Sequence, residues 1–377
     1  MSASGNLAIL RETSNRGAPV LESALQHRPV LPARLDFRIG LCGAGGIVNT
    51  AHLPAYRKAG FEVAAIYDQV TEKAQQTAAD FAIPQVCQSL EQLAGSVDIV
   101  DIAVPATQNG VVVETVAAAG KAMLIQKPLA EDWQTALDTV ATIRRAGVQA
   151  AVNQQMRWEP GVRVSRQLFE AGALGELFNL AFLVFVDTPW HLWGWLKEKP
   201  TVDVLYHSIH YLDAIRYITG AEPLTLFCDG SRRPGGDVSG ETRICLHLTF
   251  ADQLRATILT NHHASYGTDG QQSEFRVEGT EGAARRTMGL LMDYPHGVPD
   301  AFRYHTPALG KGVWRDVDFG ASWFPDAFIG PMASLMRAVN GEIEAPETAV
   351  TDNLRTLNLV AAAYRSMDKG QVVELEP

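Results

Sequence analysis

The stretch FRIGLCGAGGIVNTAHLPA (37–55) decides the fold. Its first five residues are typical of a buried strand, and the glycine run that follows opens a predicted helix. Glycines permit a tight turn and let a phosphate approach the backbone, while free N–H groups at the helix start attract that anion. Val48 stands where the fingerprint usually has Gly or Ala, so slightly looser helix packing is expected. The stretch predicts a pyrophosphate site at Gly43, Gly45, Gly46 and Ile47.

Short β-rich runs alternate with helical spacing over 37–153, which is typical of a parallel sheet with crossover helices. Most of the strands are continuously apolar, as strands buried on both faces are. The predicted strands are 37–41, 63–67, one at Val86, 98–104, 122–126 and 148–153, and the predicted helices are 71–80, 109–118 and 131–146. Thr71 and the pair Glu131-Asp132 are the expected N-terminal caps or helix-dipole partners, and Gly60, Gly120 and Gly147 the expected helix ends.

The alternation of strands and helices ends after Asn153, and several of the later predicted strands follow one another without helices between them. This pattern predicts an α+β domain with a large, mainly antiparallel sheet. Its predicted helices are 159–171, 203–219, 325–340 and 348–369, and its strands 176–187, 224–228, 242–250, 254–262 and 274–278. The expected organisation is an N-terminal extension (1–36), a doubly wound Rossmann domain (37–153) and an α+β substrate-binding and oligomerisation domain (154–377) whose C-terminal helices pack back.

The chain length predicts two domains, because 377 residues exceed the usual size of a domain with a single hydrophobic core. The formal net charge of −10 argues against nucleic-acid and anionic-membrane partners and favours a small-molecule ligand. Four well-separated cysteines indicate neither a disulfide framework nor a zinc knuckle, and no signal peptide or membrane-spanning run is expected. A cytoplasmic location is the simplest interpretation.

Asp68 ends the second predicted strand, about 20 residues after the glycine loop, where an acid hydrogen-bonds the adenosine ribose. A carboxylate there repels a 2′-phosphate, so NAD is expected in preference to NADP. The alternative is that Asp68 only caps the helix beginning near Thr71.

Lys127 ends the fifth predicted strand, and open α/β sheets bind their ligands at the carboxyl ends of strands. A solvated lysine before a strand-ending proline is the simpler alternative.

From about Arg38 to the C-terminal helix the sequence resembles the family of glucose-fructose oxidoreductase, inositol 2-dehydrogenase and the rhizopine-catabolism oxidoreductases. The matching pieces are GAGGIVNTAHLPA (43–55), VPATQN (104–109), AAAGKAMLIQKPLA (117–130), AVNQQMRWEP (151–160), GALGEL (172–177) and HYLDAIRYITG (210–220). The resemblance implies further cofactor contacts from Pro105, Asn109, Gln126, Lys127 and Asn153, and a substrate contact from Arg157.

In that family the lysine of an E-K-P motif and the histidine of an H-x-x-D segment act at the substrate, which implies these roles for Lys127 and His210. Histidine suits removal of a hydroxyl proton during hydride transfer, and lysine suits polarising the same oxygen. Two positions depart from the family pattern. Gln126 replaces its glutamate, and Tyr206 replaces an aspartate one helical turn before the histidine.

Asp203 and His207 repeat an acid–histidine spacing on the same helix and are candidates for supplying the missing acid, or for a surface pair. Of His262 and His263, only one can face the site from a strand. No acid or cysteine lies at ligand spacing near them, so no metal site is predicted. A predicted loop contains Trp190, His191, Trp193 and Trp195. Its indole rings are expected either to stack on the face of a sugar or to pack into the core or a subunit contact.

These features predict an NAD-dependent dehydrogenase that oxidises a secondary alcohol of a sugar, sugar acid or cyclic polyol. Its substrate-side residues are Lys127, Arg157, Trp190, Trp193, Asp203, Tyr206, His207, His210 and His262, with Tyr206 and His207 also candidates for catalysis. Two alternatives stay open: an enzyme that retains NAD for isomerisation or cleavage without net redox, and a non-catalytic NAD-sensing regulator. A homo-oligomer, dimer or tetramer, is expected from the resemblance.

Overall fold

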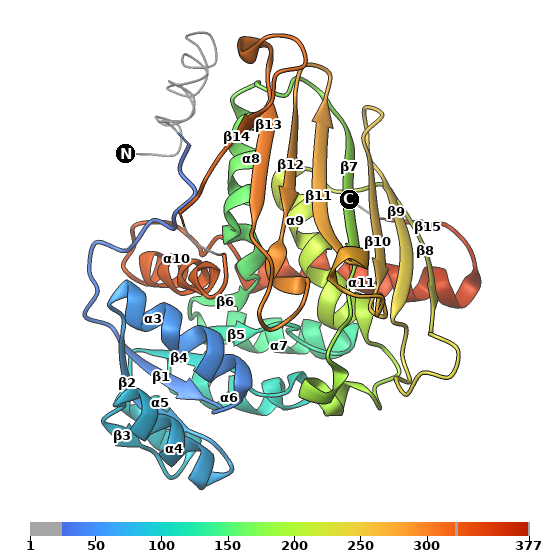
Figure 1. Ribbon diagram of the computed structural model, residues 1–377. Coiled ribbons are helices and arrows are strands. Elements are labelled where there is room, and N and C mark those ends of the chain that lie inside the picture. Colours follow the sequence, from blue (N-terminus) through green and yellow to red (C-terminus); the bar gives the residue numbers. More distant parts are fainter. Residues whose placement is uncertain (1–24, 321–322, 376–377) are drawn as a thin grey trace. The chain divides into compact units, whose positions relative to one another are not determined.

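The computed structural model describes residues 25–320 and 323–375, which divide into two compact units. The Rossmann unit comprises 28–158 and 323–358, and the sheet unit comprises 25–27, 159–320 and 359–375. Most of the expected N-terminal extension, residues 1–24, lies outside the described residues. Each unit has its own sheet, and Figure 1 labels the elements of both.

The Rossmann unit is built on six parallel strands in the order β3-β2-β1-β4-β5-β6, which confirms the predicted doubly wound sheet. The chain reverses its direction of winding between β1 and β4, and ligands of such sheets bind at this switch point. The strands are β1 (Arg38–Cys42), β2 (Glu62–Tyr67), β3 (Gln85–Val86), β4 (Ile99–Ile102), β5 (Ala122–Gln126) and β6 (Ala150–Asn153).

The crossover helices of this unit are α3 (Leu53–Ala59), α4 (Thr71–Phe81), α5 (Leu90–Ser96), α6 (Asn109–Ala118) and α7 (Trp133–Ala146). Of these, α4, α6 and α7 lie close to the predicted helices 71–80, 109–118 and 131–146. Asp132 caps α7 as predicted, by accepting the Thr135 N–H at 2.9 Å. Thr71 was wrongly expected to cap α4, because the chain reaches helical geometry one residue earlier and Val70 holds the cap position. The sequence also missed α5, which has only seven residues and is capped by Ser89.

A C-terminal segment completes the Rossmann unit. Helix α10 (Ile329–Val339) packs on β5 and β6, and its apolar face shares a core with Ile39, Leu41 and Val48. The chain then adds to the edge of β6, where the Val152 N–H donates to the Thr348 carbonyl at 2.9 Å.

The sheet unit carries nine strands in the order β14-β13-β12-β11-β7-β10-β9-β8-β15. All neighbours are antiparallel except β7 and β10, so the predicted mainly antiparallel sheet is confirmed. Helices α8 (Pro160–Glu170) and α9 (Ile209–Thr219) pack together against this sheet (Figure 1). The strands are β7 (Leu177–Phe185), β8 (Thr225–Ser231), β9 (Arg243–Thr249), β10 (Arg255–Asn261), β11 (Gln272–Gly279), β12 (Ala283–Thr287), β13 (Ala301–His305), β14 (Arg315–Asp316) and β15 (Val373–Glu374).

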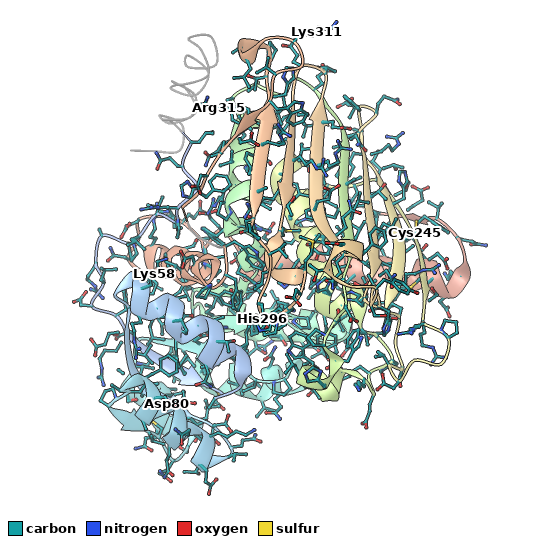
Figure 2. All side chains as sticks on the ribbon, in the orientation of Figure 1. Lys58, Asp80, Cys245, His296, Lys311 and Arg315 are labelled. Atoms are coloured by element: carbon teal, nitrogen blue, oxygen red, sulfur yellow. The ribbon has the colours of Figure 1, made fainter. Side chains whose placement is uncertain are left out.

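The remaining elements are α11 (Val350–Lys369), which begins in the Rossmann unit and continues into the sheet unit, and nine short helical turns. Among the described residues these turns are η1 (Val48–His52), η2 (Ala106–Gln108), η3 (Gln155–Trp158), η4 (Trp190–Leu196), η5 (Val204–Ser208), η6 (Thr268–Gly270), η7 (Gly289–Leu291), η8 (Pro307–Leu309) and η9 (Asp326–Phe328). In the described part of the chain, no helix has the length and apolar character needed to cross a bilayer. All four cysteines are free, and only Cys245 is exposed (Figure 2).

Candidate functional site

The glycine loop lies between β1 and η1, at the carboxyl edge of the parallel sheet. Gly43 has φ +111°, and a Cβ there would lie 2.5 Å from the Ala103 carbonyl oxygen after β4, so only glycine fits. A Cβ added at Gly45 or Gly46 would meet no protein atom within 4 Å. The loop therefore presents two glycines on an open side, where side chains would occupy the space that a pyrophosphate needs. This geometry fits a dinucleotide.

Asp68 follows β2 and binds two backbone N–H groups of the same edge. Its Oδ2 accepts the Ala44 N–H and its Oδ1 the Val70 N–H, both at 2.8 Å. The second bond supports the start of α4, so the capping alternative has a structural basis. The first bond holds the carboxylate against the glycine loop, which is where an adenosine ribose would meet it.

Gln126 and Lys127 end β5, and Lys127 is joined to Pro128 by a cis peptide bond. The Gln126 Oε1 accepts the Lys127 N–H at 2.8 Å, which fixes the amide beside the lysine. The Lys127 side chain is partly buried, and loss of contact with water lowers the pKa of its ammonium to about 8. The ammonium therefore predominates at pH 7, with roughly a tenth of the lysine neutral, and the neutral form predominates above pH 8.

A buried polar network that the sequence analysis missed holds Gln126 in place. His52, from η1, lies with its Nδ1 2.6 Å from Asp101 Oδ2 on β4, and the Tyr56 hydroxyl donates to the same oxygen at 2.7 Å. The His52 Nε2 lies 3.1 Å from the Gln126 Nε2. An Nδ1–H donated to Asp101 leaves Nε2 as an acceptor for the amide. A neutral glutamine therefore suits this position, whereas a glutamate would require a proton on Nε2.

Three more predicted cofactor residues lie at the same edge of the sheet. Pro105 precedes η2 after β4. The buried Asn109 donates its amide to the carbonyls of Pro128 and Leu129, at 3.3 and 3.0 Å, and so anchors the segment after Lys127. The buried Asn153, at the end of β6, lies 3.3 Å from His52 Nε2. For Asn109 and Asn153 these contacts support a positioning role, and direct cofactor contact stays a prediction.

Arg157 is engaged within the Rossmann unit. Its guanidinium donates to the Glu347 carbonyl at 2.6 Å and pairs with the Asp352 carboxylate. These bonds tie η3 to the segment around the start of α11. The predicted substrate contact of Arg157 stays a prediction.

In the sheet unit, the predicted helix 203–219 forms as the wide turn η5 followed by α9. Glu241, which the sequence analysis did not single out, accepts the N–H groups of Val202 and Val204 at 3.0–3.2 Å. The Tyr364 hydroxyl donates to Glu241 Oε1 at 2.7 Å and accepts the Leu205 N–H at 3.2 Å. The helix start is thus satisfied by side chains distant in sequence, which local patterns do not reveal.

Asp203 is fully buried at this helix start, with His207 and His262 beside it. The His262 Nε2 lies 3.4 Å and the His207 Nδ1 3.9 Å from its carboxylate oxygens. Ser208 donates to Asp203 at 2.6 Å, and Thr260 donates as well. Burial raises the pKa of this carboxyl, but the two imidazoles and the Ser208 hydroxyl outweigh it and hold the pKa at about 2. Asp203 is therefore an anion at neutral pH.

The remaining predicted substrate residues gather around this group. His210 is buried on α9, and Tyr206 is nearly buried, with the Trp195 ring edge-on at 5.3 Å. The Trp190 ring lies 5.7 Å from that of His262, and Trp193 lies 5.4 Å from Tyr294. His262 is buried and His263 is partly exposed, as the alternation predicted. Trp190 is thus the member of the tryptophan loop that packs against the histidines.

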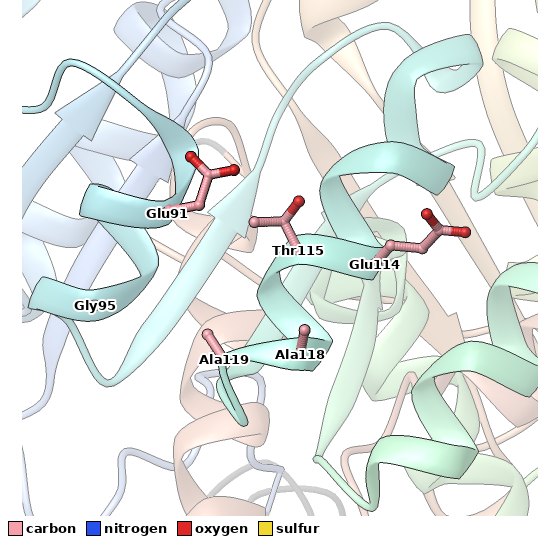
Figure 3. A pocket seen from close by; sticks show the side chains of 6 residues that line it. All are labelled: Glu91, Gly95, Glu114, Thr115, Ala118 and Ala119. Atoms are coloured by element: carbon pink, nitrogen blue, oxygen red, sulfur yellow. The ribbon is translucent and has the colours of Figure 1, made fainter.

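A separate shallow depression lies between α5 and α6 (Figure 3). Gly95, Ala118 and Ala119 line it where these helices end, and these helix ends lead into the amino ends of β4 and β5. It therefore belongs to the edge opposite the glycine loop, and its lining of Glu91, Glu114 and small residues offers no group for hydride chemistry.

An open glycine loop, an acid after β2 and a lysine after β5 place the chain in the class of nicotinamide-dependent oxidoreductases. Residues 37–154 match the oxidoreductase family with an NAD-binding Rossmann fold, and residues 162–285 match the C-terminal domain of the same family. The chain belongs to this family, the Gfo/Idh/MocA oxidoreductases, and its Rossmann unit binds NAD.

Similar proteins extend over nearly the whole chain. A D-apiose dehydrogenase of Paraburkholderia graminis is 29% identical over 352 residues, covering 90% of each chain. An inositol 2-dehydrogenase of Rhizobium meliloti is 23% identical, covering 90% of this chain and 99% of the relative. A levoglucosan dehydrogenase solved with NADH and L-sorbose superposes with a TM-score of 0.78 at 18% identity, covering 90% of this chain and 99% of the other. The structural likeness shows the shared fold.

Proposed function

We propose that this protein oxidises a secondary alcohol of a sugar, sugar acid or cyclic polyol with NAD. The observation that carries the proposal is Lys127, a lysine with a lowered pKa at the carboxyl end of β5, on the edge that holds the glycine loop. The relatives named for their activity act on apiose and inositol, which are polyhydroxylated molecules with secondary alcohols. NAD is preferred to NADP because the Asp68 carboxylate repels a 2′-phosphate.

Two residues divide the chemistry at the reacting carbon. The family pattern gives His210 the role of accepting the hydroxyl proton. It gives the Lys127 ammonium the role of donating a hydrogen bond to the substrate oxygen as negative charge develops there. Bound NAD supplies the hydride acceptor. Gln126 orients Lys127 through its main-chain N–H, and His52 orients Gln126 in turn. Asn109 keeps the segment after Lys127 in place.

Residues of the sheet unit provide substrate recognition. Tyr206 and His207 offer polar groups for hydroxyls, with the buried Asp203 and His262 beside His207, and Trp190 and Trp193 offer aromatic faces for the apolar C–H face of a sugar ring. Such a mixture of aromatic faces and a few placed polar groups is typical of small-molecule sites.

We also propose a homo-oligomer that acts in the cytoplasm. Four free cysteines suit a reducing compartment. Phe178, on the large sheet, and Trp195 are each about half exposed (47% and 53%), which suits a subunit contact. Light scattering coupled to size-exclusion chromatography measures the assembly directly.

The test is a screen of aldoses, sugar acids and cyclic polyols with the purified protein and NAD, following NADH absorbance. For the best substrate, Lys127→Ala should lower kcat by at least about 10³-fold while NAD affinity changes less than about threefold. Lys73→Ala, which removes an exposed lysine of the same unit, is the matched control and should match the unmodified protein.

Turnover by Lys127→Ala at the unmodified rate would rule out the assigned role. NAD that stays bound through purification, with a substrate rearranged or cleaved and no NADH released, would favour the internal-redox alternative. NAD binding without any turnover across the screen would favour the regulator.

A further inference from the structure

The strongest unassigned feature is the group formed by Asp203, His207 and His262 in the sheet unit. One potential ligand atom from each of the three lies within 4.8 Å of the other two. We propose that these residues bind one divalent transition-metal ion such as Zn²⁺. The binding does not depend on the proposed hydride chemistry, because all three residues belong to one compact unit and the ion is tested by binding alone.

The separations suit metal ligation better than direct hydrogen bonding. The His207–Asp203 distance of 3.9 Å and the His262–Asp203 distance of 3.4 Å both exceed the usual range of an N–H···O bond. Ligand atoms at ~2.1 Å from one ion, in tetrahedral geometry, lie about 3.4 Å from each other. The imidazole nitrogens and the carboxylate oxygens therefore stand at distances that an ion between them would require, after a small inward movement of His207.

Surrounding hydroxyl groups orient two of the ligands. The Thr188 hydroxyl lies 2.7 Å from His262 Nδ1, and when it accepts an N–H there, the Nε2 lone pair faces Asp203. Ser208 and Thr260 each donate to one Asp203 oxygen, which leaves a further lone pair on both. A lone pair facing an anion is repulsive unless a cation lies between them, so the site needs a metal ion or a proton.

The donor set selects the kind of ion. Two imidazoles and one carboxylate suit Zn²⁺, Mn²⁺ or Fe²⁺, whereas Ca²⁺ and Mg²⁺ prefer all-oxygen sites. Three protein ligands leave at least one coordination position open. The His207 side chain is 27% exposed, so water or an oxygen ligand has access on that side.

The Asp203–His207–His262 group is not visible in the sequence, because His262 lies more than 50 residues after the other two. No metal site is predicted from the sequence, because no acid or cysteine lies near His262 along the chain. That reasoning was incomplete, because the end of β10 brings His262 beside the helix start that carries Asp203 and His207.

The experiment titrates Zn²⁺ into the full-length chain, freed of affinity tag and stripped with chelator, by calorimetry. One ion per chain is expected, with at least about a hundredfold weaker binding in His207→Gln and in His262→Gln. The matched control is His296→Gln, since His296 lies 3.9 Å from Asp293 on the surface and should leave the titration unchanged (Figure 2).

Thr188→Val keeps all three ligands and removes only the hydroxyl beside His262, so it tests the site even if a histidine variant unfolds. It should weaken binding about 10- to 100-fold. Cobalt(II) should give an intense visible spectrum that the His207 and His262 variants lose. Equal Zn²⁺ affinity in all variants, or no saturable binding by the unmodified chain, would overturn the proposal in favour of an Asp203–His262 ion pair.

Discussion

Gly43 and Gly46, both in the nucleotide loop, have different roles: the first is needed for the fold and the second for cofactor binding. Gly43→Ala should destabilise the fold by about 2–3 kcal/mol, because it combines a positive φ with a Cβ 2.5 Å from the Ala103 carbonyl oxygen. Gly46→Ala places its Cβ in open space, so unfolding should change little while NAD affinity falls at least about tenfold. Urea unfolding and calorimetric NAD titration measure both variants. Equal losses of stability would contradict the assignment of the open side to the cofactor.

Lys127 makes the proposed oxidation depend on pH in a definite direction. Its pKa, lowered to about 8 by loss of water contact, means that the ammonium predominates below pH 8 and is lost above it. If the ammonium holds the developing alkoxide, kcat/KM should fall about tenfold per pH unit well above pH 8. Initial rates with the best substrate give the profile.

The opposite slope has a specific meaning. A rate that rises through pH 8 would identify Lys127, and not His210, as the proton acceptor. NMR titration of the methylated lysines, with Lys127→Ala for assignment, locates the pKa independently of activity.

At the level of elements, Asp101 joins η1 to β4, and through His52 it joins both to β5. Asp101→Asn replaces the buried acceptor of two hydrogen bonds, so it should destabilise the protein by about 2–4 kcal/mol and loosen Gln126 and Lys127. Tyr56→Phe removes only one of these bonds and should cost about 1–2 kcal/mol. Denaturant unfolding and kcat measure the two effects. Full kcat in the Asp101→Asn variant would show that the network does not position Lys127.

Element prediction succeeded where the chain repeats a simple pattern. Continuously apolar runs gave all six strands of the Rossmann sheet, and β5 and α6 have the predicted bounds. It failed for α5 and for β12 to β15, which are short or carry mixed polarity. These strands form because a neighbouring strand supplies their hydrogen bonds, and a sequence window does not contain that neighbour.

Site prediction had the same limit. Residues at strand ends, such as Asp68 and Lys127, were found because parallel strands bring their carboxyl ends to one edge. His52 lies inside a quoted family segment, yet its role depends on a buried carboxylate on another strand. Glu241 and Thr188 likewise act on residues far along the chain, so no spacing rule finds them.

Over the whole molecule, the two proposed ligand sites fall in different units. The glycine loop, Asp68 and Lys127 belong to the Rossmann unit, whereas the histidine–aspartate group belongs to the sheet unit. Each unit has a sheet and a buried core of its own. Binding energy from NAD and from a metal ion should therefore appear first as local stabilisation of different segments.

Hydrogen exchange followed by mass spectrometry resolves these segments. At about 100 Kd of ligand, the bound unit gains ~2.7 kcal/mol, which slows exchange about a hundredfold where opening requires ligand release. NAD should protect 43–52, 66–71 and 103–109, and Zn²⁺ should protect 188–191, 202–210 and 260–263. Gly46→Ala should weaken only the first pattern and His262→Gln only the second. If either variant removed both patterns, the two ligands would share one site, and the assignment of a separate metal site to the sheet unit would fail.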